Sequence, residues 1–167
     1  VVCWGTNAGA ILGVDTSGAH VNRQNDPSAF VAIDFGSDAE SNDYTATALA
    51  GYGDHACVIR NDGNVHCWGD GALGNDKSGS FGGDSTNTVA AGGPVALRSD
   101  APAVQIAVAK DTTCVLQADY RVTCWGKVDR TNGDVLGQST PSIGLEVGGG
   151  TPFALPVEAM QPIVFHS

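Results

Sequence analysis

The stretch HACVIRNDGNVHCWG, residues 55–69, places two cysteines ten positions apart around the turn-forming sequence Asn61-Asp62-Gly63. A second stretch, TTCVLQADYRVTCWG at residues 112–126, repeats the same cysteine spacing. In both stretches, short runs rich in β-branched residues flank the turn, which predicts an antiparallel hairpin. The shared spacing indicates that one structural unit is used at least twice.

The cysteines of each hairpin are expected to face each other. In a hairpin centred on Asp62, Cys57 lies opposite Cys67. Directly opposed residues of antiparallel strands have Cα atoms about 4.5–5.5 Å apart, which is within reach of a disulfide. The same register places Cys114 opposite Cys124. We therefore expect two cross-strand disulfides.

A metal site is the alternative for the first hairpin, because His55, Cys57, His66 and Cys67 cluster in the sequence. Strand alternation, however, puts His66 on the face opposite Cys67. The second hairpin keeps both cysteines but has threonines in place of both histidines, and no C-x-x-C spacing occurs in the chain. We favour disulfides over zinc or free thiols, which predicts an extracellular, cell-surface or bacterial periplasmic location.

The motif Cys-Trp-Gly occurs three times, and a Leu-Gly pair follows each copy. Between the copies the sequence predicts only short strands, four in each unit, separated by loops rich in Gly, Asp, Asn and Ser. Four antiparallel strands in a repeating unit are typical of a β-propeller blade, so the fold is expected to be all-β. The expected strands lie at 30–35, 45–51, 56–60 and 64–69 in one unit, and at 94–99, 104–109, 113–117 and 121–126 in the next.

This pattern divides the chain into the end of one blade plus a loop (1–29), a full blade (30–93), a second full blade (94–151) and the start of another (152–167). Cys3 occupies the second-cysteine position of its copy, so its partner is expected ten residues earlier, before residue 1. Since propellers typically have about 4–8 blades, we expect an incomplete arc. Further propeller sequence or neighbouring chains are expected to cover both of its open faces.

Three tryptophans, Trp4, Trp68 and Trp125, occupy the same position in the repeat. Equivalent aromatic residues of repeats usually fill the core, so we expect them to pack between blades. A ring of exposed aromatic side chains that binds a ligand is the alternative. For His55 we expect a turn or inter-blade hydrogen bond rather than a catalytic role.

The composition excludes several classes of function. A net charge of −10 and a pI near 4.4 argue against a nucleic-acid partner, because phosphate binding requires clustered cations. No apolar run approaches the length of a membrane helix, so direct membrane insertion is not expected. The sequence has no recognisable nucleophile motif, which predicts a protein that is not an enzyme and has no cofactor. The acidic loops 34–43, 74–84 and 129–134 are interpreted as solvated, with calcium binding as the alternative.

The first hairpin resembles the regulator-of-chromosome-condensation repeat, whose pattern is similar to G-x-x-H-x-C-x-L, then D-G-x-V-x-C-W-G, then L-G. The second hairpin matches more loosely and departs at Lys110, Thr112 and Tyr120. The resemblance implies blades of a propeller that is usually seven-bladed, and the paired cysteines resemble those of the bacterial extracellular branch. The matching residues are Gly53, His55, Cys57, Asp62, Gly63, Val65, Cys67, Trp68, Gly69, Leu73 and Gly74.

Family members differ in function, so the fold does not determine the role. We expect a non-enzymatic, secreted or cell-surface recognition module that binds a protein or glycan partner through its loops. The alternative is a structural subunit that forms one sector of a larger extracellular assembly.

Overall fold

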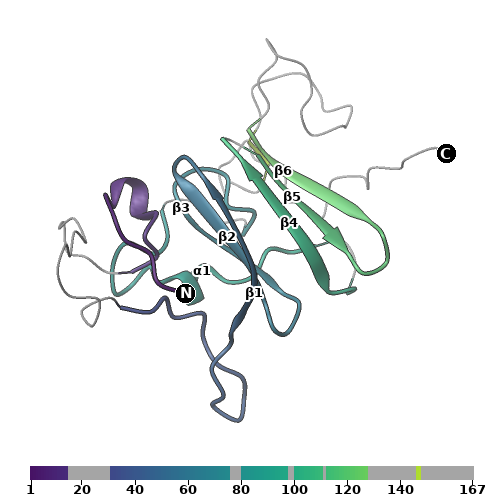
Figure 1. The fold of residues 1–167 in the computed structure, drawn as a ribbon, viewed down its shortest axis with the longest axis horizontal. Helices are drawn as coiled ribbons and strands as arrows, with labels where there is room; N and C mark the ends of the chain where they lie inside the picture. The colour runs from purple at the N-terminus through teal and green to yellow at the C-terminus, as the bar shows by residue number, and fades with distance from the viewer. Residues whose placement is uncertain (15–30, 76–79, 98–99, 111, 128–145, 148–167) are drawn as a thin grey trace.

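The computed structural model describes residues 1–14, 31–75, 80–97, 100–110, 112–127 and 146–147. These residues form two antiparallel sheets and two short helical segments (Figure 1). The expected strands beyond residue 152, and the loop at 129–134, lie outside the described residues.

The first sheet has the strand order β1-β2-β3, and the second has the order β4-β5-β6-β7. Each strand pairs antiparallel with its neighbour, as a propeller blade requires. The helical segments are η1 (Ala8–Ala10) and α1 (Val89–Gly92). The strands are β1 (Ala46–Tyr52), β2 (His55–Arg60), β3 (Val65–Gly69), β4 (Ala103–Ala109), β5 (Thr112–Gln117), β6 (Val122–Lys127) and β7 (Glu146–Val147).

The two hairpin turns have the same backbone geometry although their sequences differ. Gly63 has a φ of 81° and its N–H donates to the carbonyl of Arg60. Tyr120 takes the equivalent place with a φ of 65°, and its N–H donates to the carbonyl of Gln117. Because the second turn has a tyrosine where the first has glycine, the sequence predicts a turn that differs in detail, yet the same hydrogen bond and a positive φ occur in both turns. The hydrogen bonds of the hairpin hold Tyr120 in a left-handed conformation that few non-glycine residues adopt.

Two segments that were expected to begin blades instead lie beside the hairpin strand of the preceding copy. The N–H of Ile33 donates to the carbonyl of Val1, and the N–H of Val95 donates to the carbonyl of Val65. Val1 and Val65 each precede the cysteine of a Cys-Trp-Gly motif by two positions. Residues 31–35 and 94–97 form no strand among the described residues, so assigning them as first strands was wrong.

In both sheets, the chain that follows the hairpin pairs with the hairpin's second strand. Gly126 of β6 pairs with Val147 of β7, and Gly69 of β3 forms the equivalent bridge with Phe81. The ends of β3 and β6 are therefore paired with the chain that follows them. The blade boundaries at residues 30, 94 and 152 stay predictions.

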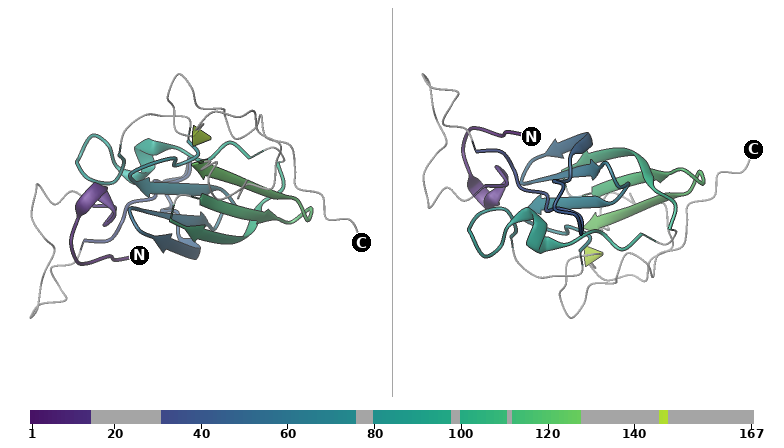
Figure 2. Two further views of the ribbon diagram at one scale, coloured as in Figure 1. Left: turned by 90° about the horizontal axis from the view of Figure 1, so that it is seen from above. Right: turned by 90° about the horizontal axis from the view of Figure 1, so that it is seen from below.

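The described parts form three layers in chain order: the N-terminal segment, the first sheet and the second sheet (Figure 2). Both faces of β2 and β3 are buried, because each face belongs to a different core. One core joins the first sheet to the N-terminal segment and includes Leu12, Ile33, Phe35, Val58 and Trp68. The other core joins the two sheets and includes Cys57, Ile59, Leu73, Val95, Val115 and Trp125.

Candidate binding surface

Both hairpin cysteine pairs form disulfides in the structure. The N–H of Arg60 donates to the carbonyl of Asn64, and alternation from that pair makes Cys57 and Cys67 a non-hydrogen-bonded pair. Side chains approach most closely at such pairs. The Cα–Cα distances are 4.0 Å for Cys57–Cys67 and 4.1 Å for Cys114–Cys124. Each disulfide joins the two strands of its hairpin.

Cys3 forms no disulfide with another described cysteine. It is half-buried, and burial raises the pKa of its thiol, although the nearby N-terminal charge acts in the opposite direction. A partner before residue 1 stays a prediction.

Trp68 packs into the copy of the repeat that precedes it. Its indole Nε1 donates to the carbonyl of Ile11 at 2.8 Å, and the ring of Phe35 lies 6.1 Å away between centroids. A Cβ atom on Gly13 would lie 2.9 Å from Trp68 Nε1, so glycine is needed for the indole to fit.

Trp125 packs in the same way against Gly74, since a Cβ atom there would lie 2.6 Å from Trp125 Nε1. In the described part of the chain, Leu12-Gly13 and Leu73-Gly74 therefore each receive the tryptophan of the next copy. Trp68 and Trp125 are fully buried, whereas Trp4 is 68% exposed. The sequence revealed the Leu-Gly pairs but not this role.

A side-chain hydrogen bond links the two sheets at their interface. His55 Nε2 lies 3.0 Å from Thr113 Oγ1, and both side chains are buried. Cys57 Sγ lies 3.8 Å from the same hydroxyl. The inter-blade hydrogen bond expected for His55 is confirmed. With Cys57 and Cys67 joined in a disulfide, the part of the suggested zinc cluster that is formed by His55 and Cys57 lies in the blade interface.

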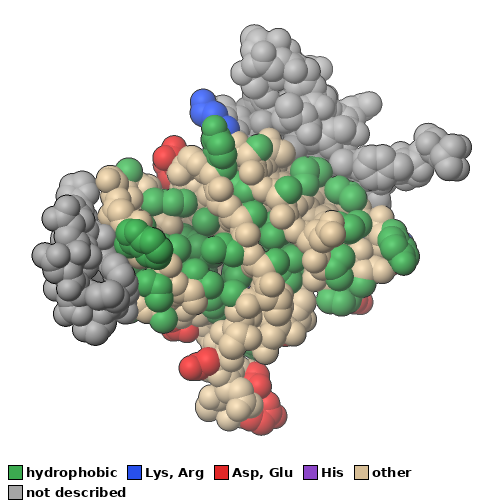
Figure 3. Space-filling model, in the orientation of Figure 1, with side chains coloured by type: hydrophobic (Ala, Val, Ile, Leu, Met, Phe, Trp, Pro, Cys, Tyr) green, Lys and Arg blue, Asp and Glu red, His purple; other side chains and the backbone are tan. Residues whose placement is uncertain are grey.

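A groove of about 400 Å³ runs between the N-terminal segment and β1. We name it the Cys3 groove. Cys3, Trp4 and Thr6 line it on the side of the N-terminal segment, and residues 49–53, at the end of β1 and just beyond it, line the other side. Ala56 and Trp68 also line the groove. The rim is apolar, because Leu49 is 51% exposed and Tyr52 is 60% exposed. Figure 3 shows hydrophobic side chains gathered over β1 and β4 on this face.

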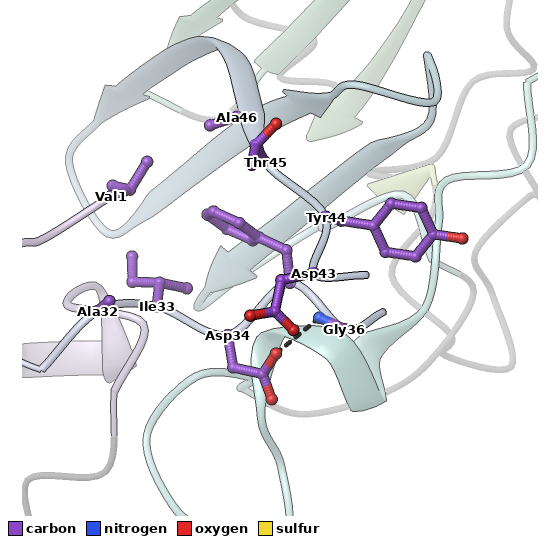
Figure 4. Close-up of a pocket in the computed structure, with 10 residues that line it drawn as sticks. Val1, Ala32, Ile33, Asp34, Gly36, Asp43, Tyr44, Thr45 and Ala46 are labelled. Atoms are coloured by element: carbon purple, nitrogen blue, oxygen red, sulfur yellow. Dashed lines mark hydrogen bonds between the residues drawn. The ribbon is translucent and has the colours of Figure 1, made fainter. Parts of the chain in front are cut away.

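A second cavity, of about 640 Å³, lies where residues 32–36 and 43–46 meet near Val1 (Figure 4). Asp34 and Asp43 both line it, and Asp34 Oδ1 accepts a hydrogen bond of 2.7 Å from the N–H of Gly36. Tyr44 also lines the cavity, and the guanidinium of Arg60 lies 3.6 Å from the centroid of its ring. The aspartate and the arginine thus contribute to local structure, and the cavity is a weaker candidate for a site.

The acidic loop at residues 34–43 projects from one end of the molecule (Figure 3). Its Asp38 carboxylate accepts hydrogen bonds from the N–H groups of Glu40 and Asn42 and from the side-chain amide of Asn42. The hydrogen bond from the Asn42 side chain is the main reason that the pKa of Asp38 is lowered.

Asp84 orders a second loop. Its carboxylate accepts hydrogen bonds from the backbone and side chain of Thr86, at 2.8 and 2.6 Å, and of Asn87, at 2.8 and 3.0 Å. These bonds, led by that from the Thr86 side chain, lower the pKa of Asp84. Among the described residues no group of three or more His, Cys, Asp or Glu side chains is placed to hold a metal ion. Calcium binding gains no support from these carboxylates.

No helix in the described part of the chain is long and apolar enough to cross a membrane.

Residues 46–75 match the sequence profile of the Regulator of chromosome condensation (RCC1) repeat. The match covers β1, β2, β3 and the Leu73-Gly74 pair. This segment of the chain is therefore an RCC1-type repeat. No curated protein resembles it closely enough in sequence to count as a relative.

Solved structures, among them yeast RCC1 (Prp20), have the same fold. Prp20p from Saccharomyces cerevisiae aligns with 80% of this chain and 30% of its own, at 22% identity and a TM-score of 0.52. Yeast RCC1 (Prp20) in its complex with Kap60 aligns over 95% and 32%, at 23% identity and 0.52. Human WBSCR16 aligns over 88% and 31%, at 21% identity and 0.51. The chain thus spans about a third of the length of these proteins, and the likeness establishes the fold.

Proposed function

We propose that this RCC1-type chain is a non-enzymatic recognition module, secreted or at the cell surface, which binds a protein or glycan partner through its loops. One observation carries the proposal: the loop at residues 80–88 is ordered by four hydrogen bonds to the Asp84 carboxylate and begins at a bridge to β3. A loop held in one conformation loses little entropy on binding.

The blade beneath the loop supports the same proposal. The strand that anchors the loop, β3, is buried throughout and is joined to β2 by the Cys57–Cys67 disulfide. Variable loops on a rigid frame are a common way to build a binding surface. Disulfides persist in oxidising compartments, which supports a location outside the cytoplasm.

A protein is the first class of partner to test. Prp20p has been characterised for its binding to Gsp1p and histones, and Kap60 has been crystallised bound to yeast RCC1. This chain has a net charge of −10, which disfavours nucleic acid because phosphates would be repelled. The groups with reactive chemistry in the hairpin, Cys57 and His55, are occupied by a disulfide and an inter-blade hydrogen bond.

The test uses the 167-residue chain immobilised under oxidising conditions, with extracellular proteins of the source and a glycan array as ligands. Replacing residues 83–87 with a Gly-Ser linker, which keeps Phe81 and its bridge to β3, is expected to weaken binding at least tenfold. Asp84→Ala should weaken it less, because it loosens the same loop without removing its side chains. Asp119→Ala, in the turn of the second hairpin, is the matched control. The proposal is overturned when binding survives loop replacement but one polar substitution within a blade abolishes a chemical activity.

A structural subunit is the second candidate, favoured by the exposure of Trp4, Leu49 and Tyr52 on one face. Such a face suits a sector that packs against other blades. Native-size measurement separates the two, because a subunit copurifies with fixed partners, whereas a recognition module is recovered without them.

A further inference from the structure

One repeat further along the chain, the place equivalent to the Cys3 groove is filled by a β-strand. Cys67 and Trp68 correspond to Cys3 and Trp4, and β4 corresponds to β1. In the filled copy, β2 lies beside β3 and contacts β4. The groove between residues 3–6 and β1 is thus the place that a strand like β2 occupies in the next repeat.

In the filled copy, two side chains of β2 make specific contacts with the neighbouring strands. Cys57 is bonded to Cys67, and both Cys57 and His55 contact the hydroxyl of Thr113. The residue equivalent to Thr113 is Ala56, which lines the Cys3 groove. A side chain opposite Cys3 would therefore point into the groove toward Ala56.

Exposure of the groove walls agrees with an absent strand. Leu49 is 51% exposed, whereas its equivalent Ile106 packs against the core between the two sheets. Trp4 is 68% exposed, whereas Trp68 is fully buried. The interface between the two sheets is thus continued by a second, open copy of the same surface.

We infer that the Cys3 groove binds an extended β-strand of an RCC1-type hairpin supplied by polypeptide outside residues 1–167. The strand lies along residues 1–5 and places a cysteine opposite Cys3, in the register of the Cys57–Cys67 pair. Strand addition of this kind gains affinity from main-chain hydrogen bonds and specificity from alternate side chains. This surface is separate from the loops of the proposed function, so either can fail without the other.

The register allows a disulfide to form by exchange. The Cys3 thiolate attacks the strand's sulfur in a mixed disulfide with glutathione; the Cys3–strand S–S bond forms, the strand–glutathione bond breaks, and glutathione leaves as the thiolate. One disulfide replaces another, so the step needs no further oxidant. Because burial raises the pKa of the Cys3 thiol, the exchange is best followed at about pH 8.5.

The probe is a synthetic peptide with the sequence of residues 54–61, DHACVIRN, supplied as its glutathione mixed disulfide. The control peptide has the same composition scrambled around the fixed cysteine. We expect the β2 peptide to modify Cys3 in the full 167-residue chain at least ten times faster than the scrambled peptide, as measured by intact mass and peptide mapping. Equal rates would show only an accessible thiol and would overturn the inference.

Two matched substitutions test the place of docking. Leu49→Asp puts a charge on the wall of the groove, whereas Val104→Asp puts one at an apolar position of similar exposure, 49%, on β4. We expect Leu49→Asp to bring the rate ratio of the two peptides close to one, and Val104→Asp to leave it unchanged. A ratio that Leu49→Asp does not alter places the peptide elsewhere and contradicts the inference. Far-UV circular dichroism checks folding, and the ratio in the unsubstituted chain stands as a test if Leu49→Asp does not fold.

Discussion

The indole nitrogen of Trp68 donates a hydrogen bond of 2.8 Å to the carbonyl of Ile11, 57 residues earlier in the chain. This contact joins one copy of the repeat to the one before it. Gly13, two residues after Ile11, lets the indole approach the backbone closely. The Cys-Trp-Gly and Leu-Gly motifs therefore form one interface made by two consecutive copies.

Gly13→Ala should disrupt this interface. The new Cβ would lie 2.8 Å from Ile33 Cδ1 and 2.9 Å from Trp68 Nε1, at a residue whose φ is 70°. Overpacking and the left-handed backbone together are expected to lower the free energy of unfolding by about 2–4 kcal/mol. Urea unfolding followed by tryptophan fluorescence measures the effect. Gly71→Ala is the control, since φ there is 102° but no atom lies within 4 Å of the new Cβ. Equal losses of stability in both variants would mean that backbone strain, and not the contact with the tryptophan, causes the loss.

The disulfides should differ in their resistance to reduction. Cys57 and Cys67 are both buried, whereas Cys114 is half-exposed. Graded reduction of the 167-residue chain, followed by alkylation and peptide mapping, is expected to open Cys114–Cys124 first.

Removing either disulfide should also destabilise the chain, because it frees the closed loop in the unfolded state. Replacing both cysteines of one pair with alanine is expected to cost about 2–3 kcal/mol. Cys3→Ala is the control and should leave stability almost unchanged. Recovery of all four hairpin cysteines as free thiols from oxidised protein would contradict the assignment.

The sequence predicts the hairpins well because their information is local. A turn sequence and the two-residue period of strands fix the register, so Cys57 opposite Cys67 follows without any distant contact. Those same rules do not predict the conformation of Tyr120, because the hydrogen bonds of the completed hairpin override the preference of tyrosine against positive φ.

Long-range contacts explain the expectations that were wrong. Residues 31–35 have the composition of a strand, but their neighbour in space is Val1, and nothing nearby in the sequence identifies it. The Cys3 groove likewise arises from two segments more than forty residues apart, Cys3 and Leu49. The groove can be recognised only by comparison with the next repeat, in which β2 lies beside Cys67.

Asp62 should make stability depend on acid pH. Burial acts to raise the pKa of its carboxyl, but hydrogen bonds from Arg60 and Asn64 outweigh this and lower it from 3.8 to about 2. The ionised carboxylate therefore stabilises the fold above about pH 4, and this contribution is lost as the pH falls from about 4 to 2. Because the group is partly exposed, the effect is screened to about 1 kcal/mol.

Asp62→Asn tests this contribution, as it should cost stability at pH 7 but almost none at pH 2. Thermal unfolding across that pH range measures the difference. Asp119→Asn is the control, because its partner Arg121 is exposed and lies 3.2 Å away, and its effect should be smaller. A pH-independent loss in Asp62→Asn would point to altered turn geometry instead.

Tyr120→Gly should stabilise the chain. The φ of 65° at Tyr120 is costly for a residue with a Cβ, and the side chain is 88% exposed, so its removal gives up little packing. Glycine relieves the strain but adds entropy to the unfolded state, which leaves a net gain of about 0.5–1 kcal/mol. Urea unfolding measures the gain as a higher midpoint with an unchanged slope. Tyr120→Asn is the graded control, since asparagine tolerates this conformation better than tyrosine and should fall between the two. Destabilisation by both substitutions would contradict this prediction, because it would mean that the tyrosine ring contributes packing energy to the folded state despite its exposure.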